Sequence, residues 1–308
     1  MECHKRYLDL VYEECVEGRD FRLIDVECPC CSADKPRTLF KRGPFTYASC
    51  SECTTTYTPR RPHQDIIKSF LINSRAREFW KTEMLDATNS QRLTKVYEPV
   101  IDWIERHLQY QLPEEFLSVA DFCPRSDGLI EAWSARNIDI EYITIDPYFN
   151  TQDEHSVISP NTSKSFSAIL LDDSFAHTKS MSATLEWADQ HLNSNGLLFI
   201  RTILNDGFDM TILNDSSHAF VPFERFVCPS QIGLQKLLQN SNFEIIEFST
   251  PGQLDIWNVL EQYKPGTNKI IDLLLKQADN EVTLNSFQQF LQTNKLSSLG
   301  QIVARKKA

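Results

Sequence analysis

The stretch that decides the fold is FLSVADFCPRSDGLIEAWSARNIDIEYITID, residues 116–146. FLSVAD (116–121) and EYITID (141–146) are short, mostly apolar runs, and each ends in an aspartate. Between them, apolar residues recur at helical spacing, at Leu129, Ile130, Ala132 and Trp133. A strand, a helix and a second strand in this order predict a βαβ unit with two parallel strands.

The same alternation continues towards the end of the chain. Strand-like runs recur at 166–172, 196–202 and 243–249, and helix-like runs lie at about 182–192 and 232–238. Alternation of this kind predicts an α/β fold with a parallel sheet and helices on both faces.

Aspartates follow the predicted strands at the ends where such sheets hold ligands. Asp121 closes the first strand, Asp146 closes the second, and Asp172 and Asp173 close the strand at 166–172. A carboxylate at the second strand end is well placed to accept hydrogen bonds from two ribose hydroxyls. Aspartate is also a turn former at strand ends, so the three ends together predict a nucleoside site more strongly than any one of them.

Upstream of the sheet, closely spaced cysteines form the pattern C-x2-C-x18-C-x2-C. This spacing predicts a structural Zn²⁺ site in a zinc ribbon, because four thiolates complete a tetrahedron and leave no position for a catalytic water. The stretch TLFKRGPFTYAS between the pairs predicts a hairpin that turns at Arg42–Pro44. Cys30 is a spare thiol, and a set of buried thiols without metal is the alternative. The four predicted ligands are Cys28, Cys31, Cys50 and Cys53.

The overall charge restricts the partners of this 308-residue chain. It has 31 Lys and Arg against 42 Asp and Glu, a formal net charge of −11, which argues against nucleic acid and anionic membrane as partners. Arg60 and Arg61 are expected to be solvated surface. No apolar run is long enough for a membrane span or a secretion signal, so the nine cysteines are expected in a reducing, cytoplasmic environment.

From about residue 63 to 111 the apolar spacing becomes helical, and the segment is rich in aromatic residues. Two interpretations stay open for Phe79, Trp80, Tyr97 and Trp103: they are core anchors, or part of this segment covers the cofactor pocket. Leu112-Pro113 marks a break before the first strand of the sheet.

The order of these features resembles a known family. The ribbon, the aromatic helices and the α/β core are followed by TPGQLD at 250–255 and FLQTNKLSS at 290–298. Residues 196–213 (GLLFIRTILNDGFDMTIL) resemble a stretch in which a strand runs into a Gly-Phe-Asp turn. From Cys28 to Lys306 the chain resembles the zinc-ribbon-bearing class I S-adenosylmethionine methyltransferases of bacterial sugar and surface-polysaccharide genes.

The resemblance implies a Rossmann-like methyltransferase sheet, S-adenosylmethionine as cofactor, and a small polar acceptor such as a nucleotide sugar or a glycan. The expected organisation is an N-terminal extension (1–27), a zinc ribbon (28–62), a helical linker or lid (63–111) and the methyltransferase domain (112–308), with inserted helices at about 256–297. The implied cofactor contacts are Asp121, Phe122, Cys123, Gly128, Asp146, Pro147, Asp172 and Asp173.

Three positions depart from the family pattern. The turn after the first strand keeps one glycine, Gly128, where three are usual, and glycines there let the backbone approach the cofactor closely. The usual Glu-His after the strand at 166–172 is Ala176-His177, and Leu299 stands where the LSSH pattern has histidine.

Methyl transfer needs an aligned acceptor and a group that handles one proton. His177 is the preferred candidate base, because it lies just past a strand end and imidazole titrates near neutrality. His177 as an ordinary loop residue is the alternative, and His218 and Glu224 are further candidates. The acids Asp206, Asp209 and Asp215 are expected to cap turns, since their spacing lacks a calcium-loop pattern.

Three functions are therefore compatible with the sequence: an active methyltransferase, a degenerate methyltransferase fold that binds a nucleotide or a protein partner, and a zinc-ribbon adaptor on an α/β scaffold. Asp146, His177 and the TPGQLD motif favour the first, and the altered turn at 121–128 favours the second. The methylated atom and the oligomeric state stay open.

Overall fold

The computed structural model describes residues 2–16, 20–111, 117–122, 127–136, 139–146 and 157–307. Its centre is a seven-stranded sheet in the order β12-β13-β10-β9-β6-β7-β8. The predicted break at Leu112-Pro113 lies outside the described residues. The strands are β6 (Leu117–Phe122), β7 (Ile140–Ile145), β8 (Val157–Ile158), β9 (Phe166–Asp172), β10 (Leu192–Ile203), β12 (Phe243–Ser249) and β13 (Leu299–Lys306).

Five of these strands, from β8 to β10, run parallel, and β13 runs antiparallel to both β10 and β12. The chain moves outward from β6 to β7 and β8, then crosses back to β9 and β10. The strand order therefore reverses between β6 and β9, which is where open α/β sheets hold their ligands. The predicted α/β fold is confirmed, with a mixed, mostly parallel sheet.

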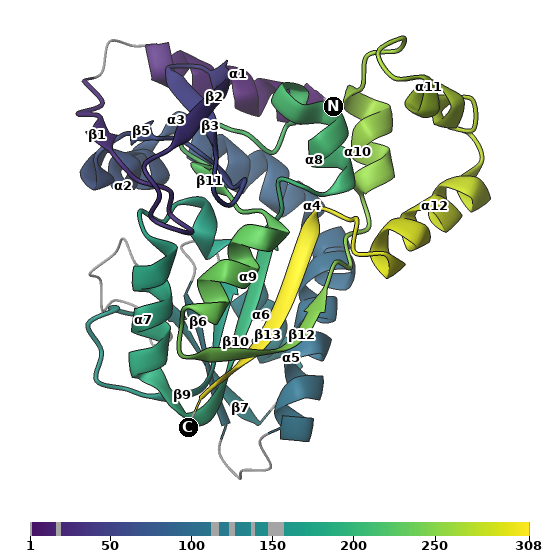
Figure 1. Cartoon of the computed structure of the whole chain (residues 1–308). Coiled ribbons are helices and arrows are strands. Elements are labelled where there is room, and N and C mark those ends of the chain that lie inside the picture. The colour runs from purple at the N-terminus through teal and green to yellow at the C-terminus, as the bar shows by residue number, and fades with distance from the viewer. Residues whose placement is uncertain are drawn as a thin grey trace.

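Helices cover both faces of the sheet (Figure 1). On one face, α5 (Glu98–Gln111) and α6 (Asp127–Ala135) bury Trp103 and Leu129 against Val119 and Phe199. On the other face, α7 (Met181–His191) and α9 (Gln231–Gln239) pack on Ile169 and Leu171 together with the ribbon. Strands buried on both faces read as continuous apolar runs, which is why the run at Phe166–Leu171 is apolar apart from Ser167.

The ribbon forms a second sheet in the order β11-β4-β3-β2. The hairpin turns at Gly43, which has a φ of 54° that suits glycine. The outer strand β11 comes from residues 227–228, more than a hundred positions after the hairpin, and it pairs with β4. The strands are β2 (Pro36–Arg42), β3 (Phe45–Cys50), β4 (Thr56–Tyr57) and β11 (Val227–Cys228).

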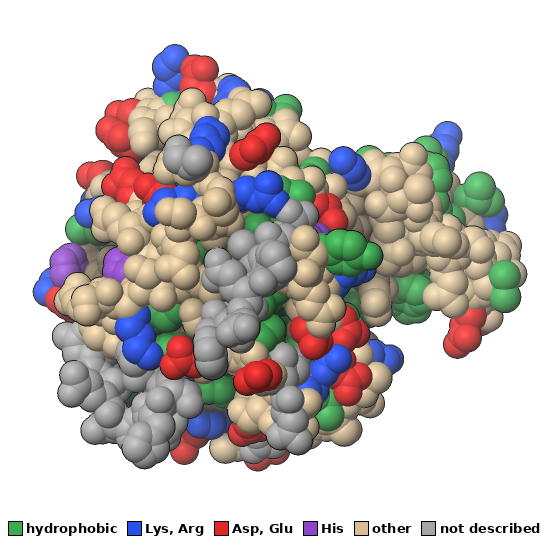
Figure 2. Space-filling model, turned by 90° about the horizontal axis from the view of Figure 1, so that it is seen from below, with side chains coloured by type: hydrophobic (Ala, Val, Ile, Leu, Met, Phe, Trp, Pro, Cys, Tyr) green, Lys and Arg blue, Asp and Glu red, His purple; other side chains and the backbone are tan. Residues whose placement is uncertain are grey.

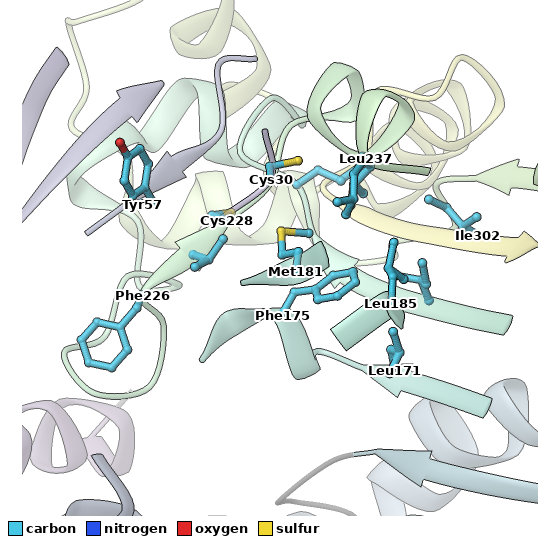
Figure 3. Packing of buried hydrophobic residues seen from close by; sticks show 14 of the residues in the cluster. Cys30, Tyr57, Leu171, Phe175, Met181, Leu185, Phe226, Cys228, Leu237 and Ile302 are labelled. Carbon is cyan, nitrogen blue, oxygen red and sulfur yellow. The ribbon is translucent and has the colours of Figure 1, made fainter. Parts of the chain in front are cut away.

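One hydrophobic cluster runs without interruption from the ribbon into the sheet. Cys30 and Tyr57 of the ribbon belong to the same cluster as Phe175, Leu185 and Ile302 of the α/β core (Figure 3). The ribbon therefore packs as part of the core and lies over the end of the sheet opposite the C-terminus (Figure 1).

Short helices complete the structure on this side of the sheet. The N-terminal α1 (Glu2–Val16) packs on the linker helices, and the two-residue strands β1 (Ile24–Asp25) and β5 (Arg60–Arg61) pair antiparallel. The linker contains two π-helical segments, a form that is rare and often found at functional sites. Its helices are α2 (Gln64–Asn73), α3 (Arg75–Phe79), η1 (Trp80–Leu85), α4 (Asp86–Arg92) and η2 (Leu93–Tyr97), which leads into α5.

The predicted helices before the last strand form an arm that projects from the body (Figures 1 and 2). Its tip exposes apolar side chains, including Ile270 and Val282. The remaining helices are η3 (Ser174–Ala176), α8 (Phe208–Leu213), η4 (Asn214–Ser216), α10 (Asp255–Gln262), α11 (Lys269–Leu275) and α12 (Glu281–Thr293).

Candidate active site

The carboxyl ends of β6, β7 and β9 lie together at one edge of the sheet. In the register of the sheet, Asp121 pairs with Thr144 of β7 and with Leu170 of β9. Asp146, Asp121 and Asp172 therefore follow one another in this order along the edge. We call it the β6 edge.

Asp121 is buried at the centre of the β6 edge, with 1% of its surface exposed. The hydroxyl of Tyr142 donates a hydrogen bond to its Oδ2 at 2.7 Å, whereas Oδ1 has no hydrogen-bond partner among the described residues. Burial, and secondarily the charge of Asp172, raises the pKa of this carboxyl well above its ordinary value. Buried polar atoms are nearly always paired, so an Oδ1 without a partner in the described part of the chain is an unusual feature of this edge.

Asp146 and Asp172 flank Asp121. Asp146 follows β7 directly and is 8% exposed. Asp172 lies opposite Arg201 of β10 in the register, and its Oδ1 is 3.5 Å from Nε of Arg201. The edge thus carries three carboxyl groups and one guanidinium, and the guanidinium offsets part of their mutual repulsion.

Tyr97 of the linker lies directly against Gly128 near the start of α6. A Cβ at Gly128 would come within 2.6 Å of Cε2 and Cζ of Tyr97, closer than any real contact. A side chain at position 128 would therefore force the ring of Tyr97 to move. Burial raises the pKa of Tyr97, and its neighbours there include Arg92, Asp172 and Arg201.

The other predicted cofactor contacts have different surroundings. The ring of Phe122 packs on Trp187, with centroids 4.6 Å apart. Asp173 has a left-handed φ of 55°, and its two oxygens accept bonds of 2.8 and 2.6 Å from Arg225. Cys123 and Pro147 lie outside the described residues.

His177 follows η3 and is 3% exposed. Its carbonyl, and that of Thr178, each accept a bond of 2.5 Å from the guanidinium of Arg61. Arg61 is 1% exposed, and its Cζ lies 5.2 Å above the centre of the Phe226 ring. The expectation that Arg61 is solvated surface was wrong. Backbone carbonyls of the loop after β9 accept hydrogen bonds from its guanidinium, whereas its neighbour Arg60 is exposed.

The remaining candidates lie elsewhere. The ring of His218 lies 4.8 Å from that of His4 in a tilted arrangement, and burial lowers the pKa of both. Glu224 is buried and pairs with Arg77 at 3.5 Å. Asp206 accepts from the backbone N–H of Gln231 at the start of α9, which is a capping contact.

Three segments that carry the family resemblance meet in one buried hydrogen-bond network. Asp255 of the TPGQLD stretch accepts bonds of 2.6 Å from the hydroxyl of Ser297, the N–H of Ser298 and the side chain of Gln288. Asp209 of the Gly-Phe-Asp turn accepts from Asn258 at 2.7 Å and from the hydroxyl of Ser298. The network joins α8, α10 and α12 to the start of β13, so Asp209 stabilises structure rather than holding a metal.

A cleft of about 580 Å³ opens beside this network. We call it the α5 cleft, because Trp103 and Arg106 of α5 form one wall together with Lys95 of η2. The other side contains Leu254 and Arg201. Arg201 also contacts Asp172, so the cleft and the β6 edge are neighbours.

The four predicted zinc ligands converge on one point. The Sγ atoms of Cys28, Cys31, Cys50 and Cys53 all lie within 4.8 Å of one another. A zinc–sulfur tetrahedron with bonds of about 2.3 Å needs sulfurs about 3.8 Å apart, and two of the pairs here are 3.5 Å apart. The four cysteines therefore fit a zinc ion. Cys30 is not part of this set: its buried sulfur lies beside Cys53 and 3.0 Å from the position that a Cβ on Gly233 of α9 would take.

Sequence reasoning missed several residues of the β6 edge. Tyr142 and Arg201 lie inside strands, and only the register of the sheet shows that they reach Asp121 and Asp172. Tyr97 was noted among the aromatic residues of the linker, but its contact with Gly128 depends on how the linker crosses the sheet.

Comparison with known proteins yields one family. A family model described as a methyltransferase domain matches residues 92–248, slightly more than half of the chain. No curated protein matches the sequence.

Several solved structures resemble the chain. A plantazolicin methyltransferase is 10% identical, with a TM-score of 0.48 and coverage of 79% of this chain and 95% of that chain. The cyclopropane synthase MmaA2 from Mycobacterium tuberculosis is 11% identical, with a TM-score of 0.40 and coverage of 67% and 84%. Coclaurine N-methyltransferase is 12% identical, with a TM-score of 0.39 and coverage of 67% and 72%. These likenesses carry no argument about the acceptor. None of the described helices is long and apolar enough to cross a membrane.

Proposed function

The chain belongs to the class I S-adenosylmethionine-dependent methyltransferases, and from this premise we propose that it binds the cofactor at the β6 edge and methylates a small polar acceptor in the α5 cleft. The observation that carries the proposal is the buried carboxyl of Asp121. Its Oδ1 has no partner among the described residues, and it lies where the strand order reverses. A fold that keeps such an atom there is prepared for a polar ligand.

The residues of the β6 edge fit the cofactor in chemical terms. Asp146 follows the second strand of the βαβ unit, where a carboxylate accepts hydrogen bonds from the two ribose hydroxyls. Asp121 and Asp172 supply acceptors for the amino group of the methionine part. Gly128 and the proposed contacts Phe122, Cys123, Pro147 and Asp173 would line the rest of the site.

When bound, S-adenosylmethionine supplies an electrophilic methyl group for an in-line displacement. The protein then has to align the acceptor atom with that methyl group and exclude water. Tyr97 lies over the start of α6 and gives the linker (63–111) the role of a lid. His177, which follows the strand that ends in Asp172, is the proposed base for the acceptor proton, and it lies on the side of the β6 edge rather than among the residues that line the α5 cleft.

The charges of the α5 cleft favour an anionic acceptor, such as a nucleotide sugar, over a neutral glycan. Asp102, an acid of the cleft, is bonded to Arg136 at 2.6 Å. The other two acids, Asp209 and Asp255, are engaged in the buried network. Lys95 and Arg106 have no acid partner in the part of the chain that the structure describes. Two uncommitted positive charges on a chain of net charge −11 are suited to a phosphate or carboxylate.

The ribbon cysteines are proposed to hold a structural Zn²⁺. With four thiolate ligands the ion has no open position, so no catalytic step is assigned to it. Its contribution is to hold the turns at 28–31 and 50–53 together beside the α/β core.

Calorimetric titration with S-adenosylhomocysteine tests the proposal. We expect Asp146→Ala to weaken binding about tenfold or more, since a hydrogen bond to a charged group contributes about 1.5–3 kcal/mol. Asp279→Ala, which removes an exposed carboxylate near the arm, is the matched control and should bind like the wild type. If folded, zinc-loaded wild type does not bind S-adenosylhomocysteine, the 121–128 turn has closed the site, and binding of another nucleotide or partner without methyl transfer becomes the better interpretation.

A further inference from the structure

The loop after β9 is held mainly by residues that come from the ribbon side of the molecule. This loop, residues 173–178, contains Asp173 and His177 and leads from the β6 edge into α7. It is short and mostly buried. We call it the β9 loop.

Arg61 makes the most unusual of these contacts. It is the largest of the fully buried side chains. It donates 2.5 Å bonds to the carbonyls of His177 and Thr178. A guanidinium buried to this degree is costly unless its donors are bonded. The hydrogen bonds to the two loop carbonyls are therefore needed to offset the cost of burying Arg61.

Two further contacts bind the β9 loop to the same region. Phe226 donates its backbone N–H to the carbonyl of Ala176 at 2.7 Å, and its ring lies beneath the Arg61 guanidinium. Arg225 holds both carboxylate oxygens of Asp173. Residues 225 and 226 are themselves bonded to the ribbon, because Tyr47 donates to the carbonyl of Arg225 and the N–H of Thr58 donates to the carbonyl of Phe226.

The chain of contacts therefore runs from the ribbon sheet through β5 and residues 225–226 to the β9 loop. The loop also bonds to β6, because the hydroxyl of Ser174 donates to the carbonyl of Phe122. One end of the loop is thus fixed to the β6 edge and the other to the ribbon.

We propose that Arg61 is a positioning residue that fixes the backbone of the β9 loop, and through it His177, so that the zinc ribbon takes part in forming the active site. The role of His177 as base rests on the function proposed above, whereas the bracing of the loop does not. A ribbon whose only task was its own folding would not need to place a buried guanidinium against a loop more than a hundred residues further along the chain.

The neighbouring arginines of β5 provide matched variants. Arg61 is buried, while Arg60 is exposed and pairs with Asp25 on the surface. We would compare Arg61→Met, Arg61→Lys and Arg60→Met in the full, zinc-loaded chain. Zinc content and circular dichroism establish that each variant is folded.

The first readout is hydrogen exchange of the loop amides. In the folded loop the N–H groups of Ala176 and Thr178 are bonded to the carbonyls of Asp173 and Phe175. We expect Arg61→Met to speed their exchange at least tenfold relative to amides of β10 in the same sample. Arg61→Lys, which can still donate to one carbonyl, should be intermediate, and Arg60→Met should match the wild type.

The second readout separates positioning from general loss of stability. The Cε1–H resonance of His177 should shift in Arg61→Met and move back towards the wild-type position in Arg61→Lys. Unchanged loop exchange and an unchanged His177 resonance in a folded Arg61→Met, or an equal effect of Arg60→Met, would overturn the proposal. If Arg61→Met does not fold, the same measurements are made on Arg61→Lys alone. Faster loop exchange and a shifted His177 resonance then support the proposal, and unchanged values overturn it. If the loop loosens as expected but S-adenosylhomocysteine fails to bind even the wild type, the bracing stands and the proposed function fails.

Discussion

The carboxyl group of Asp121 is buried. Its Oδ2 accepts a hydrogen bond from the hydroxyl of Tyr142, and its Oδ1 has no partner among the described residues. Such a carboxyl is expensive when charged, because a buried charge loses its hydration without a full set of bonds in return. The raised pKa expresses that cost. If the cofactor binds at the β6 edge as proposed, a donor that approaches Oδ1 would offset this cost.

The pH dependence of stability tests this description of Asp121. The pKa of Asp121 in the folded state lies above its unfolded value, which is about 3.9. Its contribution to the free energy of unfolding is therefore fully present below about pH 3.9 and is lost as the pH rises through the folded-state pKa. Asp121→Asn keeps an acceptor for Tyr142 and cannot ionise. We expect Asp121→Asn to be more stable than the wild type near pH 7, by about 1–3 kcal/mol, and the difference to shrink towards pH 4.

Urea unfolding of both proteins across this pH range measures the difference, with Asp279→Asn as an exposed control. A constant difference between pH 4 and pH 7 would mean that Asp121 does not carry the proton that burial implies.

Single residues were harder to place from the sequence than the elements that carry them. Arg61 follows directly after an exposed arginine, and no spacing rule distinguishes the two. Only the β1–β5 pairing and the β9 loop decide which of them points inward. Asp146 and Asp172 could be placed at the sheet edge because a strand end is a local feature, whereas the bond from Tyr142 to Asp121 depends on the register between two strands.

At the scale of elements, the segment η2 packs on the start of α6. The aromatic ring of Tyr97 occupies the space that a side chain at position 128 would need. This contact gives a structural reason for Gly128 that is independent of the cofactor.

A double-mutant cycle on this contact gives a direct test. Gly128→Ala should destabilise the wild type by about 1–3 kcal/mol, because overpacking against Tyr97 outweighs the better helix propensity of alanine. In a Tyr97→Ala background the clash is gone, and Gly128→Ala should be neutral or stabilising. Chemical denaturation of the four proteins measures the coupling. Equal effects of Gly128→Ala in both backgrounds would show that the two residues do not touch.

Most strands were predictable because each was a continuous apolar run bounded by a clear signal. The run at 166–172 ends where its apolar residues end, as in the structure. β10 begins earlier than predicted, at Leu192, because this residue pairs with Phe166 before the irregularity around Asn195. β11 was not predicted, since a strand of two residues has no periodicity and forms only because β4 of the ribbon lies beside it.

At the scale of the whole molecule, β11 from residues 227–228 belongs to the ribbon sheet, and one hydrophobic cluster joins the ribbon to the methyltransferase core. The lysine of α9, Lys236, donates to the carbonyl of Glu52 in the second CxxC turn, and Ser230 donates to the carbonyl of Cys53. The second CxxC turn is thus bonded directly to α9 and its N-cap, and α9 packs on the sheet. Loss of the proposed zinc ion should therefore lower the stability of the whole fold.

Removal of the metal is therefore expected to lower global stability rather than to unfold the ribbon alone. Cys53→Ala should lose the zinc ion and unfold at a clearly lower temperature, since structural zinc sites contribute about 10 kcal/mol to the folding of small domains. Cys30→Ala is the matched control, because Cys30 is buried beside Cys53 but is not one of the four proposed ligands. Metal analysis and calorimetric melting measure both effects. An unchanged melting curve in Cys53→Ala with no bound zinc would show that the cysteines do not hold a structural metal.

The most direct test of the central claim is hydrogen–deuterium exchange of the wild-type protein with and without S-adenosylhomocysteine. We predict slower exchange at the carboxyl ends of β6 and β7 and in the β9 loop, with no change in β2 or in α12 of the arm. Protection confined to other parts of the chain, or none at saturating ligand, would contradict a cofactor site at the β6 edge.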